Sequence, residues 1–362
     1  MILETISVGL GDRSYKIHFG HNVIDEIGPL CRSLQNANNV AVITNPVVAA
    51  LYLESVKIAL ADAGFSVYAV EIPDGEEYKS IETLKSIYDH LIAFAFDRKS
   101  FILALGGGVV GDIAGFAAAT YLRGIPFVQV PTTLLAQVDS SVGGKTGVNH
   151  ERGKNLIGAF YQPGLVLIDT ATLDTLPERE YLSGLAEVVK YGIVLDGDLF
   201  GYISTNAGKI LDRDKDCLQM VIKRSCSIKA SIVEKDEKEA GLRAVLNYGH
   251  TLGHAVETLT SYKRYTHGEA VAIGMAQAAK LSESMGFSVR AETERIISLL
   301  EALHLPVEIP YFTPSAYTDA LLHDKKARDG GINFVFNKGI GDFHMSRVND
   351  LNALLKTSGI GG

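Results

Sequence analysis

Hydrophobic residues follow one spacing in the first half of this chain and another in the second half. This change of spacing constrains the fold more than any single motif does. The first half alternates short β-rich runs with helical patterns, which is typical of a parallel sheet flanked by helices. Several runs are continuous in Val, Ile, Leu and Phe, as strands buried on both faces require. Predicted helices include Pro46–Ala63 and Ser80–Phe94. The predicted strands are Asn39–Thr44, Val67–Ile72, Ser100–Leu105, Phe127–Val130 and Leu165–Ile168.

After Leu176 and Pro177 the apolar residues recur at three- and four-residue spacing, which predicts helices. A hairpin-like piece, Ile332–His344, interrupts this pattern near the end. We therefore expect an α/β nucleotide-binding domain with a mainly parallel sheet over 1–177, followed by a mainly α-helical domain over 178–362 that binds metal and substrate. The predicted helices of the second domain are Glu178–Leu195, Lys215–Glu234, Leu242–Thr258, Glu269–Met285 and Ala291–Leu303.

The amino-acid composition excludes several classes of binding partner and cofactor. The 362 residues exceed one ordinary core, and the net charge of -8 offers no basic face for nucleic acid. Three cysteines without CxxC spacing argue against a disulfide framework or a thiolate metal site. No apolar run reaches membrane-spanning length, and the first residues lack the apolar region of a signal peptide. We expect a cytoplasmic protein with neither a nucleic-acid nor a membrane partner.

A glycine-rich turn follows one predicted strand. Gly106 to Gly111 satisfies G-x-G-x-x-G and opens a predicted helix, so backbone amides can approach a pyrophosphate. The acidic residue usual about 20 positions later is missing, because that window is Val128–Pro131. A plain tight strand–helix turn therefore stays open as the alternative.

Three further loops favour dinucleotide binding. The segment Asp74–Lys79 offers polar groups for a ribose or base, and Thr132 and Thr133 follow another strand. Asp139–Asn149 is glycine-rich and carries Lys145. Its Gly-Gly-Lys-Thr invites comparison with the P-loop, but G-x-x-x-x-G-K-[ST] fails because position 139 is Asp. Nucleotide hydrolysis is the weaker interpretation.

The most informative segment lies within the predicted helix Leu242–Thr258. A polar stripe on an apolar helix is costly to bury unless its groups pair or coordinate something, and His-x-x-x-His suits a divalent metal. Gly249 and Gly253 beside the histidines allow close approach. By this spacing both histidines would be ligands, and a pair of core histidines is the alternative. At about 100° per residue, one helix face carries Arg243, Asn247, His250 and His254.

Two other pieces could complete a metal site. Glu187 and Lys190 lie three apart on one helical face, and His267 stands just before a new helix. A carboxylate and imidazoles that leave positions open are typical of a catalytic metal site. A surface ion pair is the plain alternative for Glu187 and Lys190, but their apolar neighbours indicate partial burial. A phosphate pocket could draw on Lys145, Lys154, Lys229, Arg243, Lys325 and Lys326.

Taken together, these motifs make the chain resemble the 3-dehydroquinate synthase family of sugar-phosphate cyclases. The resemblance runs from about Asp74 to Lys326. The family's architecture, an NAD-binding α/β domain followed by a helical metal domain, agrees with the pattern above. The motifs that carry it include PDGEEYKS, ALGGGVVGDIAGFAAATYLRG, VPTTLLAQVDSSVGGKTGVNH, GKNLIGAFYQP, SGLAEVVKYG, LNYGHTLGHA and HGEAVAIGM.

The resemblance implies a reaction. The substrate would be 3-deoxy-D-arabino-heptulosonate 7-phosphate, converted to 3-dehydroquinate through oxidation by NAD+, β-elimination of phosphate, reduction, ring opening and an aldol closure. Zn2+ or Co2+ would stabilise the developing alkoxide. NAD+ would be regenerated each turnover, which makes the enzyme a lyase of the shikimate pathway. The alternatives are another sugar-phosphate cyclase, a metal-dependent NAD-linked polyol dehydrogenase and a non-catalytic NAD-sensing protein.

It also implies roles for single residues. The metal ligands would be Glu187, His250 and His267, with His254 beside the substrate hydroxyls instead of on the metal. Arg123 would reach the phosphate in a neighbouring subunit of a homodimer, and Lys325 or Lys326 would also contact phosphate. Substrate or catalytic positions would be Asp139, Lys145, Lys154, Asn155, Lys190, Lys229, Arg243, Asn247 and His254. NAD contacts would be Asn45, Asp74, Gly75, Glu76, Glu77, Tyr78, Lys79, Gly107, Gly108, Val109, Val110, Gly111, Asp112, Thr132, Thr133, Lys145, Lys154, Thr172, Leu173, Asp174 and Thr175.

Overall fold

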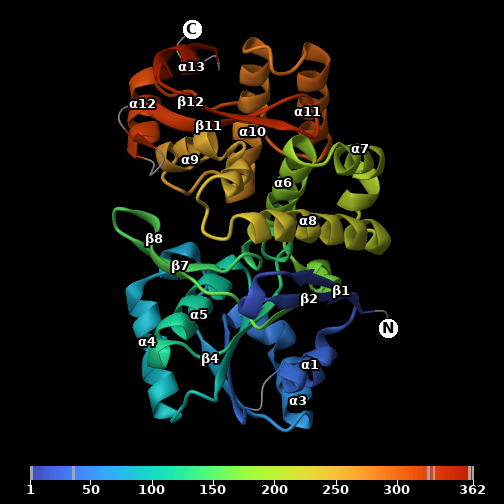
Figure 1. The fold of residues 1–362 in the computed structure, drawn as a ribbon, viewed down its shortest axis with the longest axis vertical. Coiled ribbons are helices and arrows are strands. Elements are labelled where there is room, and N and C mark those ends of the chain that lie inside the picture. The colour runs from blue at the N-terminus through green and yellow to red at the C-terminus, as the bar shows by residue number, and fades with distance from the viewer. Residues whose placement is uncertain (1–2, 35–36, 324–326, 329–330, 358–359, 361–362) are drawn as a thin grey trace. The chain divides into compact units, whose positions relative to one another are not determined.

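A computed structural model describes residues 3–34, 37–323, 327–328, 331–357 and 360, so Lys325 and Lys326 lie outside the described residues. The chain forms two compact units (Figure 1). The first comprises Met1–Leu176 with Lys229–Lys238, and the second comprises Pro177–Ile228 with Glu239–Gly362. The end of helix α8 (Lys215–Lys235) is thus grouped with the first unit.

The first unit is built on a seven-stranded sheet of order β1-β2-β9-β6-β5-β3-β4. Only β1 and β2 pair antiparallel, and every other described pair in this sheet is parallel. All five predicted strands are confirmed to within one residue at each end. The antiparallel pair β1–β2 was not predicted. The strands are β1 (Glu4–Val8), β2 (Tyr15–Gly20), β3 (Asn39–Thr44), β4 (Ser66–Glu71), β5 (Phe101–Gly106), β6 (Phe127–Pro131) and β9 (Leu165–Asp169).

Helices cover both faces of this sheet. Alternate residues of β5 point to opposite faces, so Ile102 packs with α4 (Ile81–Ala93) and α5 (Gly108–Thr120), while Leu103 packs on the other side. That second face is covered by α1 (Ile27–Leu34) and α3 (Glu54–Asp62) (Figure 1). The continuous apolar runs of the sequence therefore reflect burial on both faces. A separate hairpin, β7 (Lys145–His150) with β8 (Gly153–Phe160), carries several predicted site residues.

The second unit is mainly helical, as predicted. The predicted hairpin near the end is confirmed as β11 and β12, which pair antiparallel. Within the described residues no helix combines the length and hydropathy needed to cross a membrane. The further elements are α6 (Glu178–Val194), α7 (Gly197–Leu211), α9 (His250–Leu259), α10 (His267–Ser284), α11 (Arg290–Ala302), α12 (Pro314–His323), β10 (Ala327–Arg328), β11 (Gly331–Asn337), β12 (Phe343–Val348) and α13 (Leu351–Thr357).

The prediction of one continuous helix over Leu242–Thr258 is wrong. A short 3-10 turn over Leu242–Asn247 ends at Tyr248, and Gly249 adopts a left-handed conformation (φ 78°) before α9 begins. The break buries Tyr248, whose hydroxyl donates to Asn337 Oδ1 at 2.9 Å. Arg243 and Asn247 therefore do not share a helix face with the two histidines, and the predicted four-residue stripe does not exist as such.

Candidate functional site

Backbone contact between helices places the histidines of the second unit. Thr266 caps α10 in a capping box with Glu269, so His267 is the first residue of that helix. The next residue, Gly268, lies against α6: an added Cβ would be 1.9 Å from the carbonyl oxygen of Ser183. Its N–H also donates to Ser183 Oγ at 3.0 Å. The sequence thus fixes the start of α10 against the helix that carries Glu187.

Helices α9 and α10 approach in the same way. A Cβ on Gly274 would be 1.9 Å from the carbonyl oxygen of Gly249, and a Cβ on Gly253 would be 2.9 Å from that of Ala270. The predicted close approach at Gly249 and Gly253 is confirmed. Glycines at these positions let α9, which carries His250, pack directly on the backbone of α10.

Three side chains converge where these helices meet. Glu187 Oε1 lies 3.5 Å from His250 Nε2 and 3.7 Å from His267 Nε2. One potential ligand atom from each lies within 4.8 Å of the others. His250 Nδ1 faces the backbone oxygen of Tyr248 at 3.1 Å, so this nitrogen donates and Nε2 keeps its lone pair. The structure therefore brings together the predicted metal set.

The environment of Glu187 fits a bound cation. Its side chain is 1% exposed and contacts Lys190 Nζ, itself buried. Apart from that ion pair, neither carboxylate oxygen accepts a hydrogen bond within the described part of the chain. A buried carboxylate facing imidazole lone pairs is costly unless positive charge lies between them. One carboxylate and two imidazoles with open positions are the donor set of a catalytic zinc or cobalt site.

His254 lies beside this group but outside it. Its ring centroid is 5.4 Å from that of His250 and 6.0 Å from that of His267. It belongs to a second possible group with Glu257 and His267. Sequence reasoning missed Glu257, which is 3% exposed, although its place three residues after His254 on one helix face could have indicated it.

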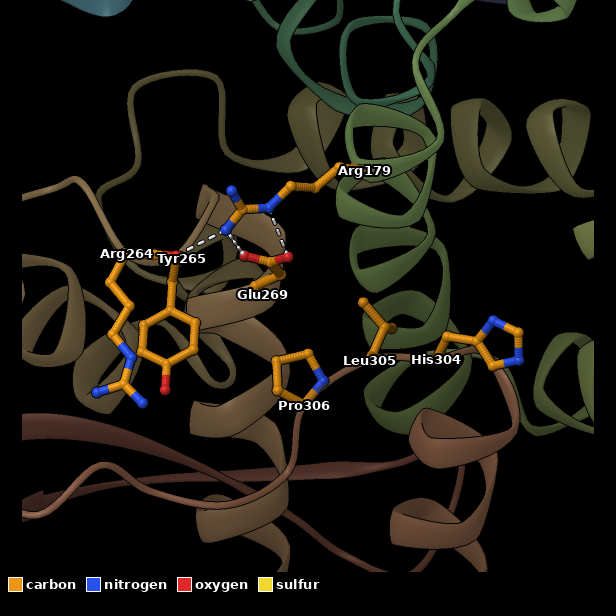
Figure 2. Close-up of a pocket in the computed structure, with 7 residues that line it drawn as sticks. All are labelled: Arg179, Arg264, Tyr265, Glu269, His304, Leu305 and Pro306. Atoms are coloured by element: carbon orange, nitrogen blue, oxygen red, sulfur yellow. Dashed lines mark hydrogen bonds and ion pairs between the residues drawn. The ribbon is translucent and has the colours of Figure 1, made fainter.

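Another carboxylate near His267, that of Glu269, has a different role. Glu269 accepts from Arg179 Nε at 2.9 Å and from its Nη2 at 2.7 Å (Figure 2). The two line a separate pocket of about 410 Å³ with Arg264, Tyr265 and three residues of the segment 304–306. Burial alone would raise the pKa of Glu269, but the Arg179 guanidinium and the Thr266 N–H outweigh it and lower that pKa. Glu269 is thus a capping residue of α10.

Two further predicted site residues of the second unit lie in the 3-10 turn that precedes α9. Arg243 is 2% exposed and lies in the 3-10 turn. Asn247 ends that turn and donates from Nδ2 to Glu239 Oε1 at 3.2 Å. Burial of a guanidinium requires anionic or polar partners, which suits a place beside a phosphorylated ligand.

In the first unit the glycine-rich turn joins β5 to α5 as predicted. Gly107 is the N-cap of α5 and offers no side-chain acceptor to the first-turn amides. A Cβ there would be 3.0 Å from Thr133 Cγ2, and a Cβ on Gly111 would be 2.9 Å from Gln129 Oε1. The glycines therefore permit close packing of helix, strand and loop, and leave amide N–H groups at a helix N-terminus that suits a pyrophosphate.

The loop Asp74–Lys79 is tied to its neighbours by side chains. Asn45 Nδ2 donates to Asp74 Oδ1 at 2.6 Å. Lys79, 4% exposed, donates to Asp112 Oδ2 at 2.5 Å and to Asn155 Oδ1 at 2.6 Å. Burial would lower the pKa of Lys79, but the carboxylates of Asp112 and Glu76 outweigh it and raise that pKa. Lys79 thus connects three of the predicted cofactor-binding elements.

The remaining predicted positions of the first unit differ in exposure. Lys145 is exposed at the start of β7, and Lys154 is half-buried in β8. Asp139 Oδ1 accepts from Lys229 Nζ at 2.7 Å. Thr172 and Leu173 are buried, and the hydroxyl of Thr172 donates to the Asp169 carbonyl at 2.8 Å.

Known proteins match the whole chain. The family models for the N-terminal and C-terminal parts of 3-dehydroquinate synthase match residues 69–183 and 184–327. The 3-dehydroquinate synthase of Geotalea uraniireducens (strain Rf4) is 66% identical over 359 residues, which are 99% of this chain and 100% of that relative. That of Geobacter metallireducens is 62% identical, covering 99% of this chain and 100% of the relative.

Solved structures extend the comparison. A 2-epi-5-epi-valiolone synthase from Streptomyces hygroscopicus subsp. jinggangensis 5008, with NAD+ and Zn2+ bound, is 31% identical with a TM-score of 0.87, covering 97% of this chain and 98% of that one. A 2-deoxy-scyllo-inosose synthase complexed with carbaglucose-6-phosphate, NAD+ and Co2+ is 28% identical with a TM-score of 0.88, covering 98% of each chain. Glycerol dehydrogenase from Schizosaccharomyces pombe, at 15% identity, a TM-score of 0.65 and coverage of 94% and 89%, shares the fold alone.

Proposed function

The chain belongs to the 3-dehydroquinate synthase family, and from that premise we propose that it converts 3-deoxy-D-arabino-heptulosonate 7-phosphate into 3-dehydroquinate and inorganic phosphate. One observation carries the proposal for the site: the convergence of Glu187 Oε1 with the Nε2 atoms of His250 and His267. A Lewis acid at the oxygen of a carbinol lowers the barrier to its oxidation, and this donor set can hold one.

We propose that these three side chains hold Zn2+ or Co2+, and that the loops around Asp74–Lys79, Gly107–Asp112, Thr132–Thr133 and Thr172–Thr175 hold NAD+. When bound, the dinucleotide supplies a hydride acceptor and the metal supplies a Lewis acid. Lys190 balances the charge of Glu187 from within the protein interior. The buried ion pair holds the carboxylate in one orientation, because neither partner can turn toward water.

The other polar residues bind and orient the substrate. We assign His254 to the substrate hydroxyls, and Lys145, Lys154, Arg243 and Asn247 to its anionic groups. Lys229 fixes the side chain of Asp139 through the ion pair described above. Holding a single reacting conformer in this way is worth several kcal/mol of activation free energy.

The first test separates a cyclase from a polyol dehydrogenase, whose fold is similar. We expect catalytic NAD+ to support many turnovers, with one phosphate released per substrate and no net rise in absorbance at 340 nm. Substrate deuterated at C5 should keep its label, because the hydride returns to the carbon that lost it. Reactions without NAD+ are the control. Stoichiometric NADH, or label lost to the cofactor pool, would establish the dehydrogenase instead.

We further propose a homodimer located in the cytoplasm. The motif around Arg123 supports the dimer, since Leu122 (φ 49°), Arg123 (φ 69°) and Gly124 (φ 120°) are left-handed in succession. Such a run costs on the order of 1–3 kcal/mol per non-glycine residue, and strain of this kind concentrates at functional sites. It presents an exposed arginine, which we assign to the phosphate site of a second copy.

Mixing two inactive variants tests the shared site. In a mixed dimer of Arg123→Ala and His250→Ala, one site carries both defects and the other carries neither. We expect activity to return toward about half of the wild-type value per mixed dimer, measured as phosphate release after subunit exchange. If exchange is proven by mass and activity does not return, each site is completed within one subunit.

A further inference from the structure

We propose that Glu257 is a positioning residue of the metal centre, which holds the ring of His267 in the orientation and tautomer that metal binding requires. The proposal rests on the metal site proposed above and adds a residue to it. Glu257 need not contact the metal or the substrate. It acts through the second nitrogen of a ligand.

His267 lies between two carboxylates, one at each ring nitrogen. Its Nε2 is 3.7 Å from Glu187 Oε1, and its Nδ1 is 3.4 Å from Glu257 Oε2. A neutral imidazole has one N–H and one lone pair. When Nδ1 donates its hydrogen to Glu257, the lone pair is left on Nε2, which faces Glu187 and His250. The geometry therefore selects one tautomer.

His267 needs such a partner more than His250 does. Its side chain is 32% exposed, whereas that of His250 is 12% exposed. The capping box and Gly268 fix its backbone, but they do not set the orientation of its ring. His250 is oriented by a backbone carbonyl, that of Tyr248. The two predicted imidazole ligands are thus oriented by different means, and only one of these can be removed by mutation.

The burial of Glu257 agrees with this role. Its side chain is 4% exposed, and a carboxylate at that depth is costly unless hydrogen bonds and positive charge compensate it. Helix α9 carries His250 and Glu257 seven residues apart, two turns along the same face. A carboxylate that accepts from a metal-bound imidazole gains both kinds of compensation, and it raises the basicity of that imidazole.

A competing arrangement makes Glu257 itself a ligand, because one donor atom from each of His254, Glu257 and His267 also lies within 4.8 Å of the others. That arrangement would leave the buried Glu187 oxygens facing two imidazoles with no metal between them, although they accept no hydrogen bond in the described part of the chain apart from the ion pair with Lys190. Glu187, His250 and His267 are therefore the better candidates for the metal ligands.

The test measures Co2+ binding to the full chain. The variants are Glu257→Gln, which keeps an acceptor oxygen without the charge, and Glu257→Ala. We expect the dissociation constant, from chelator competition, to rise about tenfold in the first and up to about 100-fold in the second. The visible absorption bands of bound Co2+ should shift in both. Glu292→Gln removes the carboxylate that caps α11 and is the matched control: it should lower the melting temperature and leave the Co2+ bands unchanged.

The possible outcomes distinguish failure of the proposed metal site from failure of the positioning role. If the wild-type chain binds no Co2+, the proposed metal site itself is wrong. If it binds Co2+ and both Glu257 variants keep its affinity and bands, only the positioning role is wrong. If Glu257→Gln loses Co2+ as completely as Glu187→Gln does, Glu257 is a ligand, and the positioning role is again wrong. If Glu257→Ala does not fold, Glu257→Gln alone decides.

Discussion

Replacing His267 with alanine is expected to remove the bound metal and to lower kcat/KM by on the order of 10³-fold or more, since Lewis-acid stabilisation is worth several kcal/mol. The reason is geometric: His267 contributes one of three donors, and the other two cannot complete the set. Metal content and phosphate release should be measured on the same preparation.

His90→Ala is the matched control, because His90 is exposed on α4 in the first unit and belongs to none of the proposed sites. It should keep wild-type metal content and rate. Full activity of His267→Ala after treatment with a chelator would show that the reaction does not depend on this centre.

Gly274→Ala is expected to lower the stability of the protein strongly. The added Cβ would lie 1.9 Å from the carbonyl oxygen of Gly249 and 2.8 Å from the N atom of Gly253, so α9 and α10 must separate. We expect the free energy of unfolding to fall by about 3 kcal/mol or more, at the upper end of overpacking costs. Metal affinity should fall with it, because the two helices carry different histidines of one site. Urea unfolding and metal titration measure the two effects.

Gly201→Ala on α7 provides the comparison, since nothing lies within 4 Å of the position of its Cβ. Alanine in that helix should raise the free energy of unfolding by about 0.5–1 kcal/mol. If both glycine variants were equally stable and bound metal equally well, the backbone contact between α9 and α10 would not position the site.

Five strands of the seven-stranded sheet could be predicted, most of them because burial on both faces gives continuous apolar runs in the sequence. The runs Val40–Ile43 and Leu165–Ile168 are continuous in apolar residues, and the structure places both in the sheet interior. The glycine turn after β5 could also be predicted, since the glycines at 107 and 111 allow close contacts with the side chains of Thr133 and Gln129. The resemblance supplied the ligand set, which spacing alone did not.

What could not be predicted depends on tertiary contacts. The break at Gly249 has no signal in helical periodicity, because the apolar residues on both sides of it keep the same spacing; it is set by the packing of α10. The role of Glu257 depends on where His267 lies in space, ten residues further on and in another helix. The grouping of Lys229–Lys238 with the first unit also follows from long-range packing, which includes the hydrogen bond that Gln162 Nε2 donates to Glu237 Oε1 at 3.0 Å.

The bonds of Lys79 to Asp112 and Asn155 have a consequence for cofactor exchange. They order the loop after β4, the start of α5 and the β7–β8 hairpin through the protein's own side chains. The conformational entropy of these segments is therefore lost when the chain folds, and little remains to be lost when a dinucleotide binds. Pre-ordering of this kind lengthens the residence time of a ligand. A dinucleotide that stays bound through many catalytic cycles suits a reaction whose product has the same oxidation level as its substrate.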